Sequence, residues 1–236
     1  GQTAVIPMGP NYTGQYFFSL ATNQILSSNS RFAYDLMFDC DADHFHIWLN
    51  TAKFMSVIRT TKTDLNSVTI QDTTGQPWYF ETGDYNVDSN AIGQWYQSLT
   101  GQPASKGLVY VVSLGVDTDG NPLGTVKMQV NNFTGSEYSV TFEDFGNTQQ
   151  HTITIPKDAN HVYRYITFDN GGSVVDGIEP DKTLWDLCFT HYTVIFYEPY
   201  YLPYQVTGVL TNPTKVTVYV DSSVNYDSVR ISDFAE

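Results

Sequence analysis

Apolar and polar residues alternate along most of the chain, in short runs separated by turn-forming residues. Alternation with a period of two predicts half-buried β-strands, because successive side chains of a strand point to opposite faces of the sheet. The runs span residues 45–49, 67–71, 108–114, 125–130, 138–142, 152–155, 162–168 and 216–220. The pattern therefore predicts an all-β fold.

Glycine, asparagine and proline lie between these runs, at residues 119–122, 133–136, 170–172 and 212–213. These residue types favour tight turns, because they adopt or fix backbone conformations that strands do not use. Such short connections join antiparallel neighbours, so we expect mostly antiparallel hairpins.

One segment has a helical rather than a β-type spacing. Residues 88–90, Asp-Ser-Asn, resemble a helix N-cap, and Gly101 resembles the glycine that ends a helix. Between them the apolar residues recur at helical intervals; these residues are Ala91, Ile92, Trp95, Tyr96 and Leu99. The sequence predicts one short helix here, covering one end of the sheet.

A strand-turn-strand pattern occurs twice, once near each end of the chain. The first copy comprises residues 16–20, 22–26 and 34–38, and the second comprises residues 165–168, 169–175 and 185–189. In both copies the last strand begins with an aromatic residue, an aspartate and a leucine, which makes Asp35 and Asp186 equivalent. The repeat predicts a duplicated unit that folds within one core.

The length and composition fit one domain. All-β domains commonly reach this size, and 41% hydrophobic residues suffice for a packed core. We expect a single β-rich domain over residues 15–236, preceded by an N-terminal tether over residues 1–14.

A formal net charge of -14 restricts the partners. This charge repels phosphate backbones and anionic lipid surfaces, so we expect no nucleic acid as a partner. No apolar run approaches the ~18 residues of a membrane span. The chain also does not begin with the charged and apolar regions of a signal peptide, so an exported form is expected to have lost its signal before Gly1.

The two cysteines, Cys40 and Cys188, are predicted to be free thiols. When Asp35 is aligned with Asp186, Cys188 corresponds to Met37 and Cys40 corresponds to His191. The two cysteines then lie an odd number of positions apart in the repeat, so their side chains point to different faces of their strands. Small buried thiols are the favoured interpretation, although a disulfide stays open.

Sequence motifs of enzymes are not evident, and we predict that the protein is not an enzyme. No phosphate-binding loop, nucleophile elbow or zincin helix occurs. Asp35 and Asp186 could form a catalytic carboxylate pair. Equivalent positions in a repeat favour instead two matching hydrogen bonds to turns or backbone.

Several stretches resemble the HmuY-like family of exported haem-binding lipoproteins of Bacteroidetes. These are the aromatic strand from Tyr16, the sequence Trp-Asp-Leu-x-Phe-Thr-x-Tyr at residues 185–192, and residues 204–210. The resemblance implies a hemophore-like carrier that captures haem or a related porphyrin and passes it to an outer-membrane receptor. It also implies an outer-membrane surface lipoprotein or an extracellular protein, held to the membrane only by a lipid anchor that precedes Gly1.

Haem iron is usually held by His, Met, Cys or Tyr side chains. The candidate axial ligands, for haem as the cofactor, are His151, His161, His191, Met55 and Met128. If residues 152–155 and 162–168 form a hairpin, His151 and His161 lie too far apart to share one iron. The alternative for His191 is a hydrogen-bonded histidine at the edge of the core. The alternative for Met55 and Met128 is that they only fill space in the core.

Two further features carry alternative functions. His44 and His46 lie on one strand face and could hold a transition metal, although ordinary surface histidines are favoured and we predict no metal site. Residues 196–204 form an aromatic loop that suits a glycan or a peptide, or that packs over the sheet, which is the favoured interpretation. The competing functions are a non-enzymatic glycan- or peptide-binding surface module and a structural surface lipoprotein without a small ligand.

Overall fold

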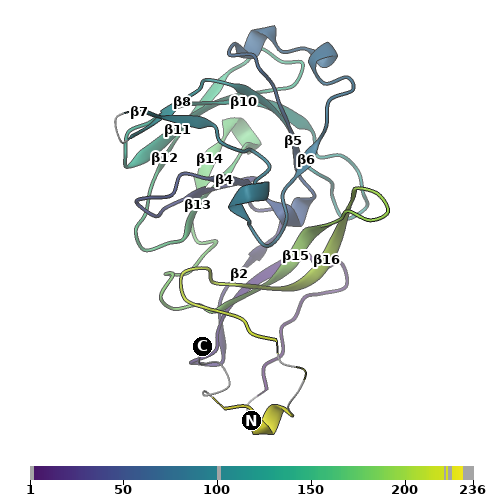
Figure 1. Cartoon of the computed structure of the whole chain (residues 1–236), viewed down its shortest axis with the longest axis vertical. Coiled ribbons are helices and arrows are strands. Elements are labelled where there is room, and N and C mark those ends of the chain that lie inside the picture. The colour runs from purple at the N-terminus through teal and green to yellow at the C-terminus, as the bar shows by residue number, and fades with distance from the viewer. Residues whose placement is uncertain (1–2, 100–101, 221, 223–224, 231–236) are drawn as a thin grey trace.

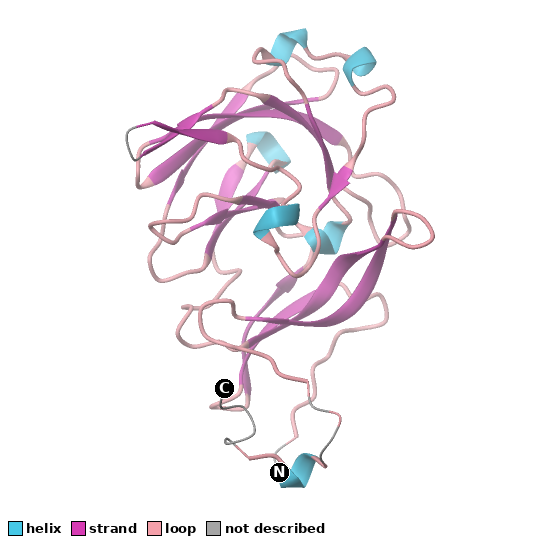
Figure 2. Ribbon diagram, viewed as in Figure 1, coloured by secondary structure: helices cyan, strands magenta, loops and turns pink. Residues whose placement is uncertain are grey.

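The computed structural model describes residues 3–99, 102–220, 222 and 225–230. Antiparallel sheets make up most of it, and its helical segments are short 3-10 turns (Figure 2). These turns are η1 (Thr51–Lys53), η2 (Leu65–Ser67), η3 (Ile70–Asp72), η4 (Val87–Ser89), η5 (Asp169–Gly171) and η6 (Tyr226–Ser228). The predicted all-β class is confirmed.

Three sheets contain almost all of the strands (Figure 1). The large sheet has the order β12 (His151–Pro156), β11 (Glu137–Asp144), β10 (Thr125–Phe133), β9 (Val109–Ser113), β5 (Ser56–Arg59), β6 (Tyr79–Phe80). The middle sheet has the order β14 (Ser173–Val175), β13 (Tyr163–Thr167), β3 (Leu36–Asp39), β4 (Ile47–Leu49). The outer sheet has the order β16 (Leu202–Thr211), β15 (Leu187–Phe196), β1 (Gly14–Ser19), β2 (Gln24–Ser30). A small hairpin joins β7 (Tyr96–Leu99) to β8 (Gln102–Ser105).

The middle sheet is buried on both faces, because its alternating side chains enter two different cores. Leu36 and Phe38 of β3 pack with the apolar face of the large sheet, in the first core. Met37, between them, packs with Phe17 and Cys188 of the outer sheet, in the second core. The three sheets therefore form three layers, with the middle sheet between the large and the outer sheets.

The duplicated units are interleaved rather than placed side by side. The first copy provides the hairpin β1–β2 and the strand β3, and the second provides the hairpin β13–β14 and the strand β15. However, β1 pairs with β15, and β13 pairs with β3, so each hairpin lies against the last strand of the other copy. The strands that follow, β4 and β16, complete two sheets with the same order.

Equivalent residues pair at equivalent places in the two sheets. Phe17 lies opposite Cys188 in the outer sheet, as Tyr165 lies opposite Met37 in the middle sheet. The duplication thus extends from the sequence pattern to the register of the strands.

Each copy has a buried polar cluster around its aspartate, which we call a joint. One joint comprises Asp35, Lys53 and Asn50, and the other comprises Asp186, Lys215 and Asn212. The Asp35 carboxylate accepts a hydrogen bond from the backbone N–H of Phe168 at 2.7 Å, and the Asp186 carboxylate accepts one from Leu20 at 2.7 Å. Lys53 forms an ion pair with Asp35. In the other joint the Lys215 Nζ lies 2.8 Å from Asp186. The predicted matching backbone hydrogen bonds of the two aspartates are confirmed.

An asparagine completes each joint. The Asn50 amide donates to the Tyr34 carbonyl at 2.8 Å, and the Asn212 amide donates to the Trp185 carbonyl at 2.9 Å. Tyr34 and Trp185 immediately precede the two aspartates, so each joint also fixes the aromatic residue beside it.

The predicted helix over residues 88–101 is wrong within the described residues, which exclude Gly101. Residues 87–89 form the turn η4 and residues 96–99 form strand β7. Gly93 adopts a φ of 70°, which interrupts a right-handed helix. Ala91, Ile92 and Trp95 are buried as the helical spacing predicted, but an irregular segment brings them into the first core.

Two predicted strands and one conditional strand pairing are also wrong. Residues 67–71 belong mainly to two 3-10 turns, and residues 216–220 form no strand. The strands β12 and β13 do not form a hairpin, because β12 pairs with β11 in the large sheet and β13 joins the middle sheet. The chain crosses between layers at residues 157–162.

The thiols of Cys40 and Cys188 are free and buried, as predicted. Among the described residues, no helix has the length and apolar character required to cross a bilayer.

Candidate functional site

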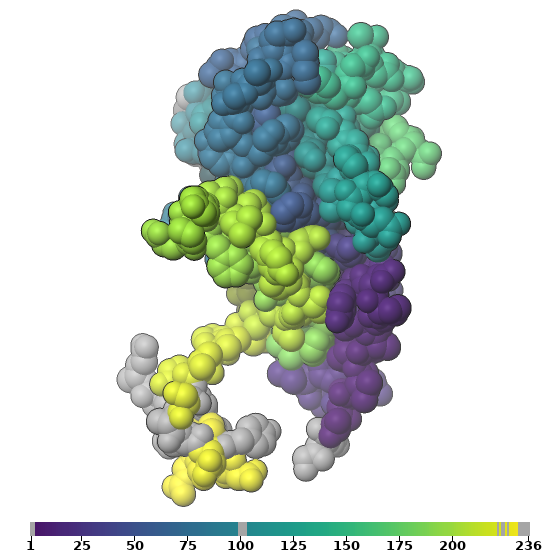
Figure 3. Space-filling model, turned by 90° about the vertical axis from the view of Figure 1, so that its right-hand side faces the viewer, coloured from purple at the N-terminus to yellow at the C-terminus, as the bar shows by residue number. Residues whose placement is uncertain are grey.

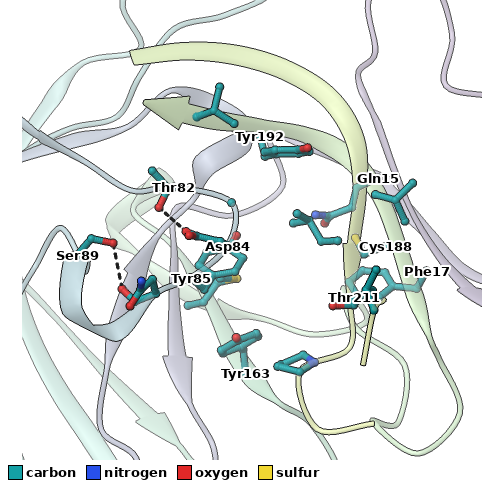
Figure 4. A pocket seen from close by; sticks show the side chains of 18 of the residues that line it. Gln15, Phe17, Thr82, Asp84, Tyr85, Ser89, Tyr163, Cys188, Tyr192 and Thr211 are labelled. Atoms are coloured by element: carbon teal, nitrogen blue, oxygen red, sulfur yellow. Dashed lines mark hydrogen bonds between the residues drawn. The ribbon is translucent and has the colours of Figure 1, made fainter. Parts of the chain in front are cut away.

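A cavity of about 790 Å³ lies where the outer and middle sheets diverge. Figure 4 shows Tyr192, Cys188 and Phe17 on one wall, which the outer sheet forms, with Tyr85 and Tyr163 across from them. Eight aromatic side chains line the cavity: Phe17, Tyr34, Tyr85, Tyr163, Tyr165, Trp185, Tyr192 and Tyr197. This volume and lining are typical of sites that bind small organic molecules.

The duplication supplies much of the lining in equivalent pairs. Phe17 and Tyr165 are equivalent, as are Tyr34 and Trp185, each of which precedes a joint aspartate. Because the two sheets face one another, the equivalent strands place these rings on the same internal space.

The second part of the lining comes from a feature that only the outer sheet has. Strands β15 and β16 are ten residues long and extend past the ends of the middle sheet. Tyr192 and Val194 lie on this extension, and the loop of residues 82–86 covers it from the other side. The backbone N–H of Gly83 donates to the carbonyl of Thr193 at 2.9 Å, which ties the loop to β15.

Two glycines make room for the Tyr192 ring. A Cβ at Gly83 would lie 2.5 Å from a ring atom of Tyr192, and a Cβ at Gly208 would lie 2.9 Å from its hydroxyl. Neither distance is compatible with a side chain in the observed arrangement. The position of Tyr192 in the wall therefore depends on both glycines.

Hydrogen bonds inside the protein fix several of the rings. Glu179 accepts bonds from the Tyr165 hydroxyl at 3.2 Å and the Trp185 Nε1 at 3.1 Å. The Tyr34 hydroxyl accepts from the Gln15 amide at 3.5 Å, and the Tyr85 hydroxyl lies 3.4 Å from the Thr51 hydroxyl. Their polar atoms are thus engaged within the protein.

Three phenols and one thiol of the described lining stay protonated. Burial raises the pKa of Tyr85, Tyr163 and Tyr165 well above the usual range, so these phenols stay protonated. Burial also raises the pKa of the Cys188 thiol, which removes the thiolate needed for nucleophilic attack. Asp84, which is exposed and accepts a hydrogen bond from the Thr82 hydroxyl, is the acidic residue of the lining.

Two buried carboxyl groups lie behind the aromatic rings. Burial raises the pKa of Glu81 to about 8, and burial also raises the pKa of Glu179, although Glu179 accepts four hydrogen bonds. The described lining includes no Lys, Arg or His side chain to balance these groups.

None of the predicted axial ligands belongs to the described lining of the cavity. Met55 and Met128 are fully buried in the first core. His151 lies on the large sheet with its ring 5.4 Å from that of Phe142, and His161 is bonded to Asp158 at 2.9 Å. The structure brings only the two methionines into one cluster, and it places Met37, which the sequence did not single out, at the cavity.

His191 has an unusual environment outside the cavity. Both of its ring nitrogens are buried without a hydrogen-bond partner among the described residues. Burial, with the nearby positive charge of Arg31, lowers its pKa to about 4, so the ring is neutral at pH 7. It lies on β15 with its ring 6.3 Å from that of Tyr12.

The other histidine pair is not part of a metal cluster. His46 bonds to the Asp39 carboxylate at 2.8 Å, while His44 is exposed. Within the described residues, no group of three or more His, Cys, Asp or Glu side chains could hold a metal ion.

The aromatic loop is the exposed tip of the β15–β16 hairpin, so the interpretation that it packs over the sheet is wrong. Phe196 is 51% exposed and Tyr200 is 79% exposed. The hairpin projects from the body of the molecule in Figure 3. Tyr197 lies at the cavity, which connects the tip with the site.

The repeat in the sequence predicted strands at residues 16–20, 34–38, 165–168 and 185–189, which line part of the cavity, but it predicted neither β16 nor the cavity. Tyr34 and Trp185 were visible as repeat positions, and the shared spacing with Asp35 and Asp186 was the available signal. The contribution of residues 82–86 carried no such signal, because the segment has neither a repeat nor a strand pattern. No protein-family model, curated protein or solved structure matches the chain.

Proposed function

We propose that the protein is a non-enzymatic binding protein that holds a small organic molecule in the aromatic cavity. The observation that carries this proposal is the lining of eight aromatic side chains around about 790 Å³. Several of these rings are fixed in advance by hydrogen bonds, which lowers the entropic cost of binding.

The chemistry of the lining supports binding rather than catalysis. Cleavage reactions need an activated nucleophile or a paired acid and base. The Cys188 thiol has a raised pKa, Asp84 lies in solvent, and the joint aspartates are engaged in backbone hydrogen bonds.

The test is a binding screen with a blocked variant. Protein-observed NMR follows titrations with indole, methyl glucoside, choline and haemin, one probe at a time. Val194→Trp fills the cavity wall, and Thr207→Trp places the same ring at an exposed position of β16 outside the described lining. We expect saturable binding of at least one probe, lost in Val194→Trp and kept in Thr207→Trp.

Two results would contradict the proposal. The first is an absence of saturable binding of every probe to the wild-type protein. The second is binding that Val194→Trp leaves unchanged, because the ligand would then occupy another place.

We propose haem carriage, which the HmuY-like resemblance implies, as the second candidate. The observation in its favour is His191, whose neutral ring has two unpartnered nitrogens and so has the form that ligates iron. Haemin should then give sharp low-spin bands that disappear in His191→Ala, with further ligands sought among His151, His161, Met55 and Met128. A broad haemin spectrum that does not saturate would contradict this candidate.

A further inference from the structure

The charge and the bonding of the cavity lining restrict the class of ligand. The polar atoms of Tyr34, Tyr85, Tyr165 and Trp185 are bonded within the protein. Tyr34, Tyr165 and Trp185 are at most 5% exposed, so the ring surface open to a ligand belongs mainly to Tyr85, Tyr163, Tyr192 and Tyr197. A sugar needs several hydrogen-bonding groups that converge on it. Aromatic surfaces with few free polar atoms therefore suit a ligand that is held by its interaction with the rings rather than by hydrogen bonds.

Aromatic rings attract cations, because the π face of a ring carries partial negative charge. The described lining has eight aromatic side chains and an exposed carboxylate, Asp84, but no basic residue. An anionic ligand would find no positive partner there, whereas a cation would meet both π faces and a carboxylate.

The buried carboxyl group of Glu81 is largely protonated at neutral pH because burial raises its pKa to about 8, so the counter-charge at the described lining is the Asp84 carboxylate. The whole chain, at -14, also attracts cations from a distance.

We infer that the cavity selects organic cations, namely ligands with an alkylated ammonium group on an apolar body. This inference rests on the proposed function and names its ligand class. The ammonium group lies among the aromatic rings, with Asp84 as the counter-charge near the opening.

Three probes of one shape and different charge test the inference. Choline is cationic, 3,3-dimethylbutan-1-ol is its neutral carbon analogue, and 3,3-dimethylbutanoate is an anionic relative. Protein-observed NMR titration gives a dissociation constant for each. Choline should bind on the order of tenfold more tightly than the neutral alcohol, and the anion should bind most weakly.

Matched variants locate the selectivity. Asp84→Asn should weaken choline severalfold without affecting the alcohol, whereas Asp88→Asn, an exposed carboxylate of the same segment outside the described lining, should affect neither. Tyr192→Leu should weaken choline more than the alcohol, and Tyr192→Phe, which keeps the aromatic face, should restore selectivity.

The outcomes separate this inference from the proposed function. Equal or tighter binding of the neutral alcohol, in a manner that Val194→Trp abolishes, would overturn cation selectivity and leave the binding protein in place. Failure of every probe in both the triad and the earlier screen would overturn the proposed function as well. Cation selectivity unchanged in both Asp84→Asn and Tyr192→Leu would overturn the assignment to this cavity.

Discussion

The middle and outer sheets have the same strand order and the same duplicated joints, but they differ in length and burial. In the middle sheet β3 and β4 have four and three residues, and both faces of β3 are covered. In the outer sheet the equivalent β15 and β16 have ten residues each. The extension carries Tyr192 and Val194 into the cavity and leaves an aromatic tip in solvent.

The difference shows how a duplicated frame acquires a site. The part that both copies share sets the register of the paired strands, buries the joints and places the equivalent aromatic residues on the inner faces of the sheets. The part that only one copy has provides the remaining wall of the cavity. Variants of the joints therefore test the frame, and variants near the extension test the site.

The largest expected effect is the loss of the buried joint in the middle sheet. Asp35→Ala leaves Lys53 buried without its partner and the Phe168 N–H without an acceptor, which should cost about 3–5 kcal/mol. Asp186→Ala should cost about 1–2 kcal/mol, because the Lys215 side chain is 35% exposed and returns to water.

Urea unfolding of both variants checks this asymmetry. Asp176→Ala is the control, since its carboxylate pairs with Arg164 while 80% exposed, and its stability should change little. Equal losses at Asp35 and Asp186 would show that the two joints are energetically alike despite their different burial.

The next effect is the pH dependence of the buried Glu81 carboxyl group, which directly follows β6. The folded-state pKa of Glu81 is about 8, above its unfolded value of 4.5, so its contribution to stability is complete below pH 4.5 and is lost as pH rises toward 8. In Glu81→Gln the side-chain oxygen can still accept the hydrogen bond from the Asn90 amide, but the side chain can no longer ionise. The variant should gain stability relative to the wild type between pH 5 and pH 9, as measured by urea unfolding. A constant difference across that range would contradict the raised pKa.

A steric change tests the wall that only the outer sheet has. Gly83→Val pushes a side chain into the Tyr192 ring and should cost roughly 1–3 kcal/mol while altering probe binding. The same substitution in a Tyr192→Ala background should cost much less, because the clash is removed. Additive losses in this double-mutant cycle would show that the two residues do not interact.

The smallest expected effect has the opposite pH dependence and lies in the outer sheet. His191 has a folded pKa of about 4, below the unfolded value of 6.5, so its contribution is complete above pH 6.5 and is lost as pH falls toward 4. His191→Phe should reduce the decline in stability over that range, and the exposed His44→Phe should not. An unchanged acid profile in His191→Phe would show that its ring is solvated in the folded state.

The sequence predicted the β class, the repeat and the matching hydrogen bonds of Asp35 and Asp186, because alternation, turn residues and repeated positions are visible locally. It missed the segment after Asp88, where tertiary burial of Ile92 and Trp95 imitated helical spacing. It also could not predict the pairing of β12 and β13, since local turn residues do not reveal a crossing between layers. The predicted ligand residues were chosen by chemistry alone, and the cavity depends instead on where the copies interleave.

The exchange of strands between the two copies has a consequence for the order of folding during synthesis. The side chains of Gln15 and Thr190 meet although 175 positions separate them, so β1 cannot pair with β15 until most of the chain exists. At ~5–20 residues per second, this delay lasts on the order of ten seconds. During that time the β1–β2 hairpin has an open edge, which is the kind of surface that other nascent chains and chaperones bind.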